Sequence, residues 1–200
     1  QRCGVFSGVS SSEFDEEAQA ASGGDGGLNL SVSHRDAQML GRTLSEAGDL
    51  KQHRIFTNKQ ATKANLKEAI TDWLPAVSRP GDTVFVVFSG HGGQVADDNG
   101  DERDQLDEFL LPADFVTASV MQVLLQRYQQ RQLDAATAKR VEHLAQLIQR
   151  AGDDAGEALI RATGVSDDLF GRWLQRLAGR QVVVMLDTCH GGGAVDAKGL

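Results

Sequence analysis

Two side chains beside glycine-rich turns, a thiol and an imidazole, are the residues in this sequence best suited to chemistry. Cys189 follows the apolar run Val182–Leu186 and precedes a glycine-rich turn. His91 follows the apolar run Val84–Phe88, within Ser-Gly-His-Gly-Gly. A thiolate beside a histidine base is an activated nucleophile, so these residues predict a Cys–His dyad, although a lone cysteine is more often an inert buried side chain. His190 is a rival base by adjacency, but on the same tight turn we expect it to point away from the thiol.

The elements that must position the dyad alternate along the chain between strand and helix. Short apolar runs predict strands and amphipathic stretches predict helices, at about residues 3–9, 33–47, 53–57, 61–77, 84–88, 167–177 and 182–186. This order predicts an α/β fold, with a mostly parallel central sheet and helices on both faces. The carboxyl ends of such strands share one edge, which would bring His91 and Cys189 together.

Two of these apolar segments carry a more specific expectation. The run 182–186 is apolar throughout, which predicts a strand covered on both faces. Phe109–Pro112 is short and ends in proline, which predicts a small hairpin beside the sheet rather than a central strand.

The motifs around the two residues, taken together, resemble the caspase-like cysteine peptidases and, among them, the metacaspases. The carriers of the resemblance are Ser89-Gly90-His91-Gly92, Asp187-Thr188-Cys189-His190-Gly191, and the acidic segment from Asp97 to Phe115. The resemblance implies a caspase-like three-layer sandwich and a cysteine endopeptidase. In that enzyme Cys189 is the nucleophile and His91 the base, and the backbone amides of Gly92 and Cys189 stabilise the oxyanion.

Three further side chains are implied in substrate binding, namely Asp36, Ser89 and Asp187. Asp187 lies two residues before Cys189, hence on the same side of an extended strand. Asp36 stands in a segment that resembles the metacaspase segment whose aspartate joins this pocket. Two carboxylates favour a cation, so the implied partners are protein or peptide substrates with Arg or Lys before the scissile bond. For Asp36 alone, an ordinary carboxylate in the first turn of a helix is the alternative.

The acidic run Asp97–Glu108 raises the question of a bound cation. An EF-hand does not fit, because the frame ending at Glu108 places Glu102 where glycine is required, and the run follows a strand. The metacaspase pattern implies instead that calcium, Ca²⁺, stimulates the enzyme. Its implied ligands are Asp107, Asp167, Asp168 and Asp196. A merely solvated acidic face is the alternative.

The resemblance spans most of the chain but is interrupted by a helical insert at about residues 116–165. The insert is either a surface elaboration or a regulatory flap with cleavable arginines, for which the candidates are Arg127, Arg131, Arg140, Arg150 and Arg161. Residues 1–200 are expected to form the large-subunit part of one catalytic domain. The small-subunit strands of a caspase-like sheet are not in this sequence, and a second chain is one possible source of them.

Composition limits the setting in which the chain works. A net charge of −8 argues against nucleic acid or an anionic membrane as partner. With only two cysteines, the chain is not expected to have a disulfide framework, and we expect a reducing, cytoplasmic location. No apolar stretch is long enough for a membrane anchor. Two other functions remain open at this stage: a non-catalytic, calcium-responsive scaffold of the same fold, and a thiol hydrolase acting on a non-peptide acyl group.

Overall fold

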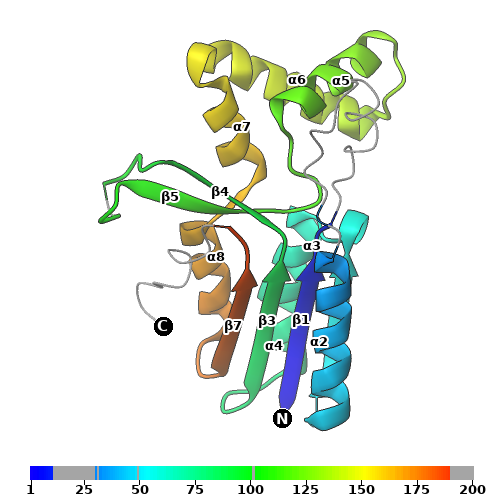
Figure 1. Ribbon diagram of the computed structural model, residues 1–200, viewed down its shortest axis with the longest axis vertical. Helices are drawn as coiled ribbons and strands as arrows, with labels where there is room; N and C mark the ends of the chain where they lie inside the picture. The colour runs from blue at the N-terminus through cyan, green and yellow to red at the C-terminus, as the bar shows by residue number, and fades with distance from the viewer. Residues whose placement is uncertain (11–29, 31, 49, 101, 190–200) are drawn as a thin grey trace.

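The computed structural model describes residues 1–10, 30, 32–48, 50–100 and 102–189. At its centre is a four-stranded parallel sheet in the order β2-β1-β3-β7 (Figure 1). The strands are β1 (Arg2–Gly8), β2 (Leu50–Thr57), β3 (Thr83–Ser89) and β7 (Gln181–Asp187). Their register pairs Gly8 with Ser89 and Ser89 with Asp187, so β1, β3 and β7 end level at one edge. The predicted parallel sheet is confirmed.

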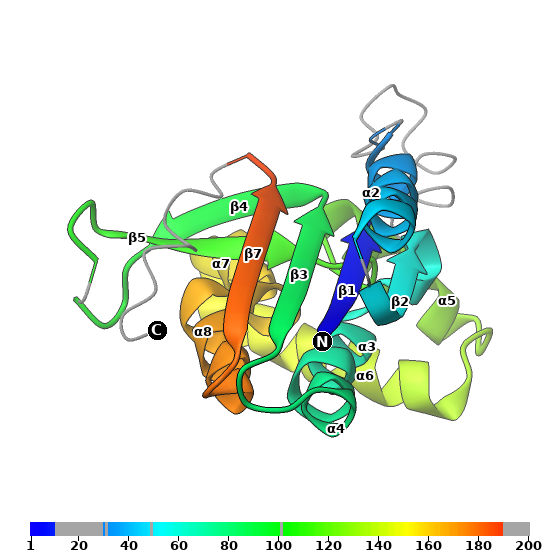
Figure 2. The same ribbon diagram turned by 90° about the horizontal axis from the view of Figure 1, so that it is seen from below.

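Helices cover both faces of this sheet, so the fold is a three-layer sandwich (Figure 2). On one face α2 (Ser33–Ala47) packs over Phe6 and Val87. The other face carries α3 (Lys63–Glu68), a π-helical turn (Ala69–Trp73), α4 (Leu74–Val77) and α8 (Asp167–Leu174). Short 3₁₀ turns occupy Asn58–Gln60 and Gln175–Leu177. Among the helices described, none has both the length and the apolar character to cross a membrane.

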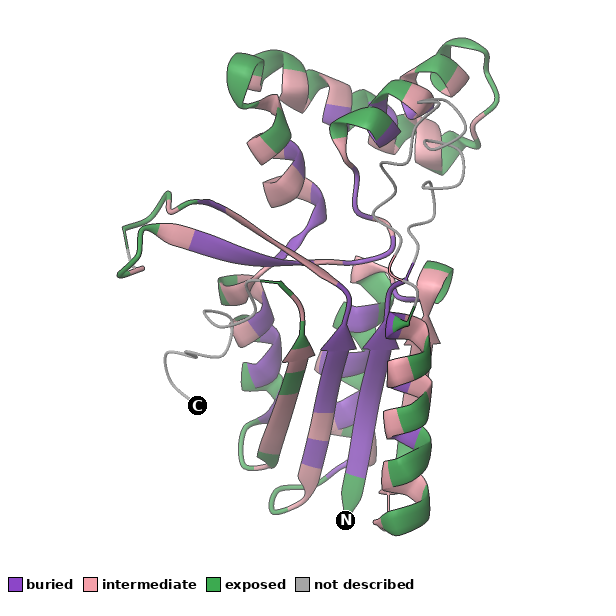
Figure 3. Ribbon diagram, viewed as in Figure 1, coloured by how far each residue is buried: buried purple, intermediate pink, exposed green. Residues whose placement is uncertain are grey.

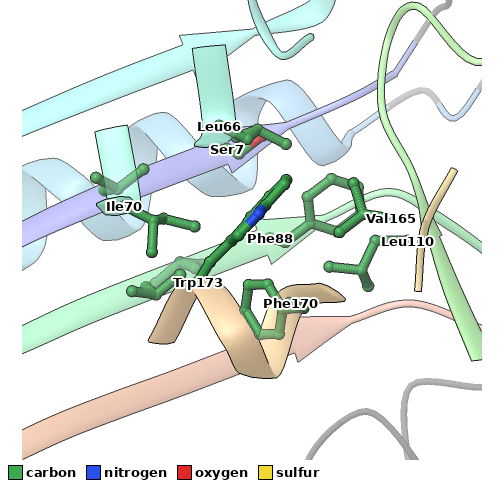
Figure 4. Close-up of a pocket in the computed structure, with 11 residues that line it drawn as sticks. Ser7, Leu66, Ile70, Phe88, Leu110, Val165, Phe170 and Trp173 are labelled. Atoms are coloured by element: carbon green, nitrogen blue, oxygen red, sulfur yellow. The ribbon is translucent and has the colours of Figure 1, made fainter. Parts of the chain in front are cut away.

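The main core lies between β1, β3 and the second helical layer, where buried residues dominate (Figure 3). It includes Val5, Ile70, Val86 and Trp173. A cavity of about 10 Å³ beside them is lined by apolar side chains and by Ser7, whose buried hydroxyl has no hydrogen-bond partner among the described residues (Figure 4). The cavity is near the smallest that can hold one water molecule, so it is not a substrate pocket.

A smaller antiparallel sheet stands beside the central one and confirms the predicted hairpin. It consists of β4 (His91–Ala96), β5 (Leu106–Leu111) and β6 (Val165–Ser166). β4 and β5 form the hairpin, and β6 pairs with β5 just before α8 begins. Because only Gly90 separates β3 from β4, the end of the central sheet leads directly into this second sheet.

The predicted insert is helical, which confirms that expectation. It contains α5 (Ala118–Gln129), α6 (Ala135–Ala151), a 3₁₀ turn (Gly152–Asp154) and α7 (Ala155–Thr163). Its helices enclose a separate core of Val116, Val120, Met121, Leu124, Val141, Leu144 and Leu159. Polar side chains begin the first two helices, because Thr117 accepts from the amide of Val120, and Asp134 from those of Ala136 and Thr137. The insert is therefore a packed unit of its own.

The expectation of a fully covered strand at 182–186 is wrong for the described part of the molecule. β7 pairs only with β3 there, so it is the edge strand of the sheet. Most of its side chains are half-buried, and Met185 is 38 % exposed. An apolar sequence indicates that a strand is suited to burial, but the neighbours that cover it belong to the tertiary structure.

Candidate active site

The predicted nucleophile and base segments meet at the carboxyl edge of the central sheet. Cys189 is an exposed free thiol just beyond β7. A Cβ atom added to Gly92 would lie 2.0 Å from the carbonyl oxygen of Cys189 and 3.3 Å from the Cβ of Thr188. Glycine is thus the residue that allows these backbones to approach so closely. His91, the residue before Gly92, is half-buried and begins β4.

The predicted specificity residues Ser89 and Asp187 are in direct contact. Their strands pair at this position, and the buried Ser89 hydroxyl donates to Oδ2 of Asp187 at 3.2 Å. The amide of Gly90 donates to the main-chain oxygen of Asp187 at 3.1 Å, which ties the turn after β3 to the end of β7. The Asp187 carboxylate is thereby held at the sheet edge, two residues before Cys189, where it can attract a cationic side chain.

Asp36 lies on α2, the helix whose start packs against the same end of the sheet. It is half-buried in the first turn of α2. The start of α2 is pressed against the end of β1, since a Cβ on Gly8 would lie 2.1 Å from the carbonyl oxygen of Ser33. As Gly8 pairs with Ser89 in the neighbouring strand, the start of the helix that carries Asp36 lies at the end of the sheet that holds Ser89 and Asp187.

Asp107, a predicted calcium ligand, instead faces an arginine of the insert. It is buried on β5 and its Oδ2 accepts from Arg161 of α7 at 2.7 Å. The same guanidinium contacts Asp98 at 3.1 Å and Glu157 at 3.0 Å. Carboxylate oxygens of Asp97, Asp98 and Asp107 lie within 4.8 Å of one another. Arg161 therefore supplies positive charge to this acidic cluster.

Asp167 lies in a second acidic group, at the start of α8. Burial raises the pKa of its carboxyl, a backbone hydrogen bond from Asp168 opposes the shift, and the charges of Glu102, Asp168 and Glu108 add to it, so that the pKa is about 6. Glu108 is buried on β5, next in sequence to Asp107, so its side chain leaves the strand on the opposite face. Asp168 is exposed and pairs with Arg172 at 3.4 Å.

The four predicted calcium ligands are thus divided by the structure. Asp167 and Asp168 are neighbours in the second acidic group, whereas Asp107 is engaged by Arg161. Asp196 lies outside the described residues. Carboxylate oxygens are the hard donors that calcium selects, but among the described residues those that lie within 4.8 Å of one another belong to Asp97, Asp98 and Asp107, not to the Asp167 group.

Sequence reasoning missed Glu108 and Arg161 as members of these clusters. Strand parity could have separated the faces of Asp107 and Glu108, because successive side chains alternate. For Arg161 no local signal existed, since it is 54 residues from Asp107 in the chain. The hydroxyl of Thr188 was also missed; it is buried next to Cys189 and has no hydrogen-bond partner among the described residues.

Comparisons with known proteins identify relatives of this chain. The family model of the metacaspase, peptidase C14 domain, matches residues 26–151, a range that includes Asp36 and His91. Metacaspase-1A of Neurospora crassa is 49 % identical over 59 residues, which are 30 % of this chain and 13 % of that protein. Metacaspase-1 of Ajellomyces capsulatus is 49 % identical over 59 residues, again 30 % of this chain, and 16 % of that protein. The aligned part of the chain is therefore only a small portion of either relative.

A solved structure shares the fold. The crystal structure of protein GSU0716 from Geobacter sulfurreducens superposes with a TM-score of 0.57 at 20 % sequence identity. The superposition covers 94 % of this chain and 50 % of that one.

Proposed function

This chain belongs to the metacaspase family of C14 peptidases, and from that membership we propose that it is the catalytic core of a cysteine endopeptidase. The observation that carries the proposal is the contact between Gly92 and Cys189. It joins the only exposed thiol of the described residues to the segment that bears His91. The fold is the caspase-like three-layer sandwich that the motifs predicted.

The proposed reaction uses this pair of residues for nucleophilic acyl transfer. His91 takes the proton of the Cys189 thiol, and the thiolate attacks the substrate carbonyl. The backbone amides of Gly92 and Cys189 donate to the oxyanion. Because Gly92 has no side chain, the approach of the oxyanion to its amide is unobstructed. His91 then gives its proton to the leaving amine, and water hydrolyses the thioester to free the thiol.

We propose a preference for Arg or Lys before the scissile bond. Asp187 and Asp36 bring two carboxylates to the edge of the sheet where Cys189 lies, and Ser89 orients the first of them. A guanidinium can engage two carboxylates through its fork of donors, whereas an ammonium acts as a point charge. Arg substrates should therefore be turned over faster than Lys substrates.

Regulation by calcium is a further part of the proposal. Asp167 and Asp168 would hold the ion together with Asp196, and Glu108 is the β5 carboxylate on their side. Asp107 leaves β5 on the opposite face and is engaged by Arg161, so Glu108 would take the place predicted for it. Bound calcium would supply positive charge that relieves repulsion among these carboxylates.

The edge of β7 supports the proposal of additional small-subunit strands. Among the described residues no strand pairs with the outer edge of β7, so its backbone there is suited to pairing with another strand. A second chain, or another part of a longer protein, would supply that strand.

The proposal is tested by turnover of fluorogenic peptides ending in Arg, Lys or Asp, with calcium and with chelator. We expect Arg turnover in wild type, a calcium-dependent increase, and losses of several orders of magnitude in Cys189→Ala and His91→Ala. Alkylation of Cys189 in His91→Ala, with an unchanged circular dichroism spectrum, controls for folding. A folded wild type that turns over none of the peptides, but binds calcium, would be the non-catalytic scaffold instead.

A further inference from the structure

We propose that the bond between Arg131 and Gln132 is the self-cleavage site of the insert. The inference rests on the proposed function, since it requires a peptidase that cuts after arginine. Five arginines of the insert were candidates, and the structure separates them. Arg127, Arg140, Arg150 and Arg161 lie within helices, whereas Arg131 lies in the connection between α5 and α6.

Accessibility distinguishes Arg131 from the other four. Peptidases bind their substrates as extended strands, so a helical site must first unwind. Arg161 is held by Asp107 and Glu157, and Arg140 by Asp114. Residues 128–132 are all exposed, and the guanidinium of Arg131 makes no hydrogen bond or ion pair with any described residue. Its side chain is therefore free to enter an acidic pocket.

The backbone at Arg131 also favours opening. Its φ of 56° places it in the left-handed region, where glycine is the usual residue after a helix. Two main-chain hydrogen bonds hold the turn: the amide of Arg131 donates to the carbonyl oxygen of Tyr128, and the amide of Gln132 donates to that of Arg127, both at 3.0 Å. Drawing this segment into an extended strand breaks these two hydrogen bonds but releases the backbone of Arg131 from its unfavourable left-handed conformation.

Three other described arginines lie outside helices and strands, and each is less suited to cleavage. Arg79 precedes Pro80, whose ring and tertiary amide oppose extended binding across the scissile bond. Arg180 donates to Ser78 and to main-chain oxygens. Arg103 stands between Glu102 and Asp104, and those charges would be repelled by the carboxylates of the pocket. The neighbours of Arg131, by contrast, are Gln130 and Gln132.

Cleavage at this bond would separate the dyad into two fragments. Cys189 attacks the carbonyl carbon of Arg131, the amine of Gln132 leaves with a proton from His91, and water releases the new carboxylate. The first fragment, 1–131, carries His91, and the second, 132–200, carries Cys189. Pairing of β3 with β7 and the shared core of α5 and α6 should hold them together, so the nicked protein should elute from gel filtration as one species.

The experiment incubates the full chain under the conditions of the peptide assay and follows fragments by intact mass. We expect wild type to release 1–131 and 132–200, and Cys189→Ala to stay intact. Arg131→Gly fits the left-handed backbone, and we expect it to keep wild-type turnover of the Arg peptide while cleavage of the insert falls at least tenfold. Arg103→Gln is the matched control in another loop and should be cut like wild type. Brief trypsin treatment of Cys189→Ala measures the accessibility of the site independently, and its first cut in the insert should follow Arg131.

These arms distinguish failure of the inference from failure of the proposed function. A wild type that turns over the Arg peptide but remains uncut would overturn the inference alone, as would undiminished cleavage of the insert in Arg131→Gly. Absence of peptide turnover would refute the proposed function. The trypsin arm tests separately the accessibility on which the choice of Arg131 rests, and a first cut in the insert after any other residue would contradict that choice.

Discussion

Gly92 is the single residue on which the geometry of the site most visibly depends. A side chain there would meet the main-chain oxygen of Cys189 at 2.0 Å, a contact that only a backbone shift could relieve. Gly92, which would donate to the oxyanion, and Cys189, which carries the thiol, can thus lie this close only because Gly92 has no Cβ atom.

We therefore expect Gly92→Ala to lower kcat/KM for the Arg peptide by about 100-fold or more, by displacing the Cys189 turn. Gly93→Ala is the matched control, because its added Cβ would approach nothing more closely than the Leu111 methyl groups at 3.8 Å. Steady-state kinetics with circular dichroism compare the two. Equal activity of both variants would show that this close approach does not matter for catalysis.

Asp167 gives a pH dependence whose sign follows from its raised pKa. Its carboxyl titrates at about 6 in the folded chain and near 3.8 when unfolded, so the folded state holds the proton more tightly. The neutral form is favoured by folding, and this contribution to stability is present at low pH and lost as pH rises through about 6.

In chelator, Asp167→Asn should therefore be more stable than wild type by about 1 kcal/mol at pH 7.5, after allowance for solvent screening, and the gain should shrink toward pH 4. Urea unfolding at several pH values measures this difference. Asp168→Asn, at an exposed position, is the control and should change stability by less than about 0.5 kcal/mol. A gain for Asp167→Asn that is constant from pH 4 to 7.5 would contradict the assignment.

Among the elements, α7 and the β4–β5 hairpin are joined by Arg161. Asp107 is buried on the hairpin, and Arg161 is its cationic partner from the insert. A buried carboxylate without a partner is costly, so the ion pair couples the insert to β5, which pairs with the strand that begins at His91.

Arg161→Gln should reduce the free energy of unfolding by about 2–3 kcal/mol, because it leaves Asp107 uncompensated. The double variant with Asp107→Asn should recover most of that loss. Arg172→Gln, which removes an exposed pair with Asp168, is the control and should cost less than about 0.5 kcal/mol. Urea denaturation of wild type, Arg161→Gln, Asp107→Asn and the double variant completes the cycle. Full additivity of the two substitutions would show that the ion pair contributes nothing.

At the scale of the whole molecule, the described residues form one core on each face of the central sheet and a separate core in the insert. Leu124 is buried among α5, α6 and α7, whereas Leu74 is buried beneath the central sheet. Because the cores share no buried residue, damage to one should be expressed mainly in its own unit.

Leu124→Ala should destabilise the insert by about 3 kcal/mol. Hydrogen exchange should accelerate in α5, α6 and α7 while β1 and β3 keep their protection. Leu74→Ala, a matched deletion in the core beneath the central sheet, should give the reverse pattern. Uniform acceleration across the chain in both variants would instead indicate that insert and sandwich unfold as one unit.

The sequence by itself determined the local features of this protein. The apolar runs before His91 and Cys189 located two strands of the sheet, and the alternation of strand and helix determined their parallel arrangement. Ser166 begins α8 as its N-cap, with its hydroxyl accepting from Leu169 at 3.2 Å. These features follow from periodicity, capping and chain order, which act over a few residues or a single crossover.

Only the tertiary structure decided which side chains meet across long separations. It placed Asp107 against Arg161 and Glu108 near Asp167, made β7 an edge strand among the described residues, and left Arg131 exposed between two helices. The physical reason is that such contacts depend on how whole elements pack. Neither the charge of a residue nor its local period specifies its partner from a distant segment.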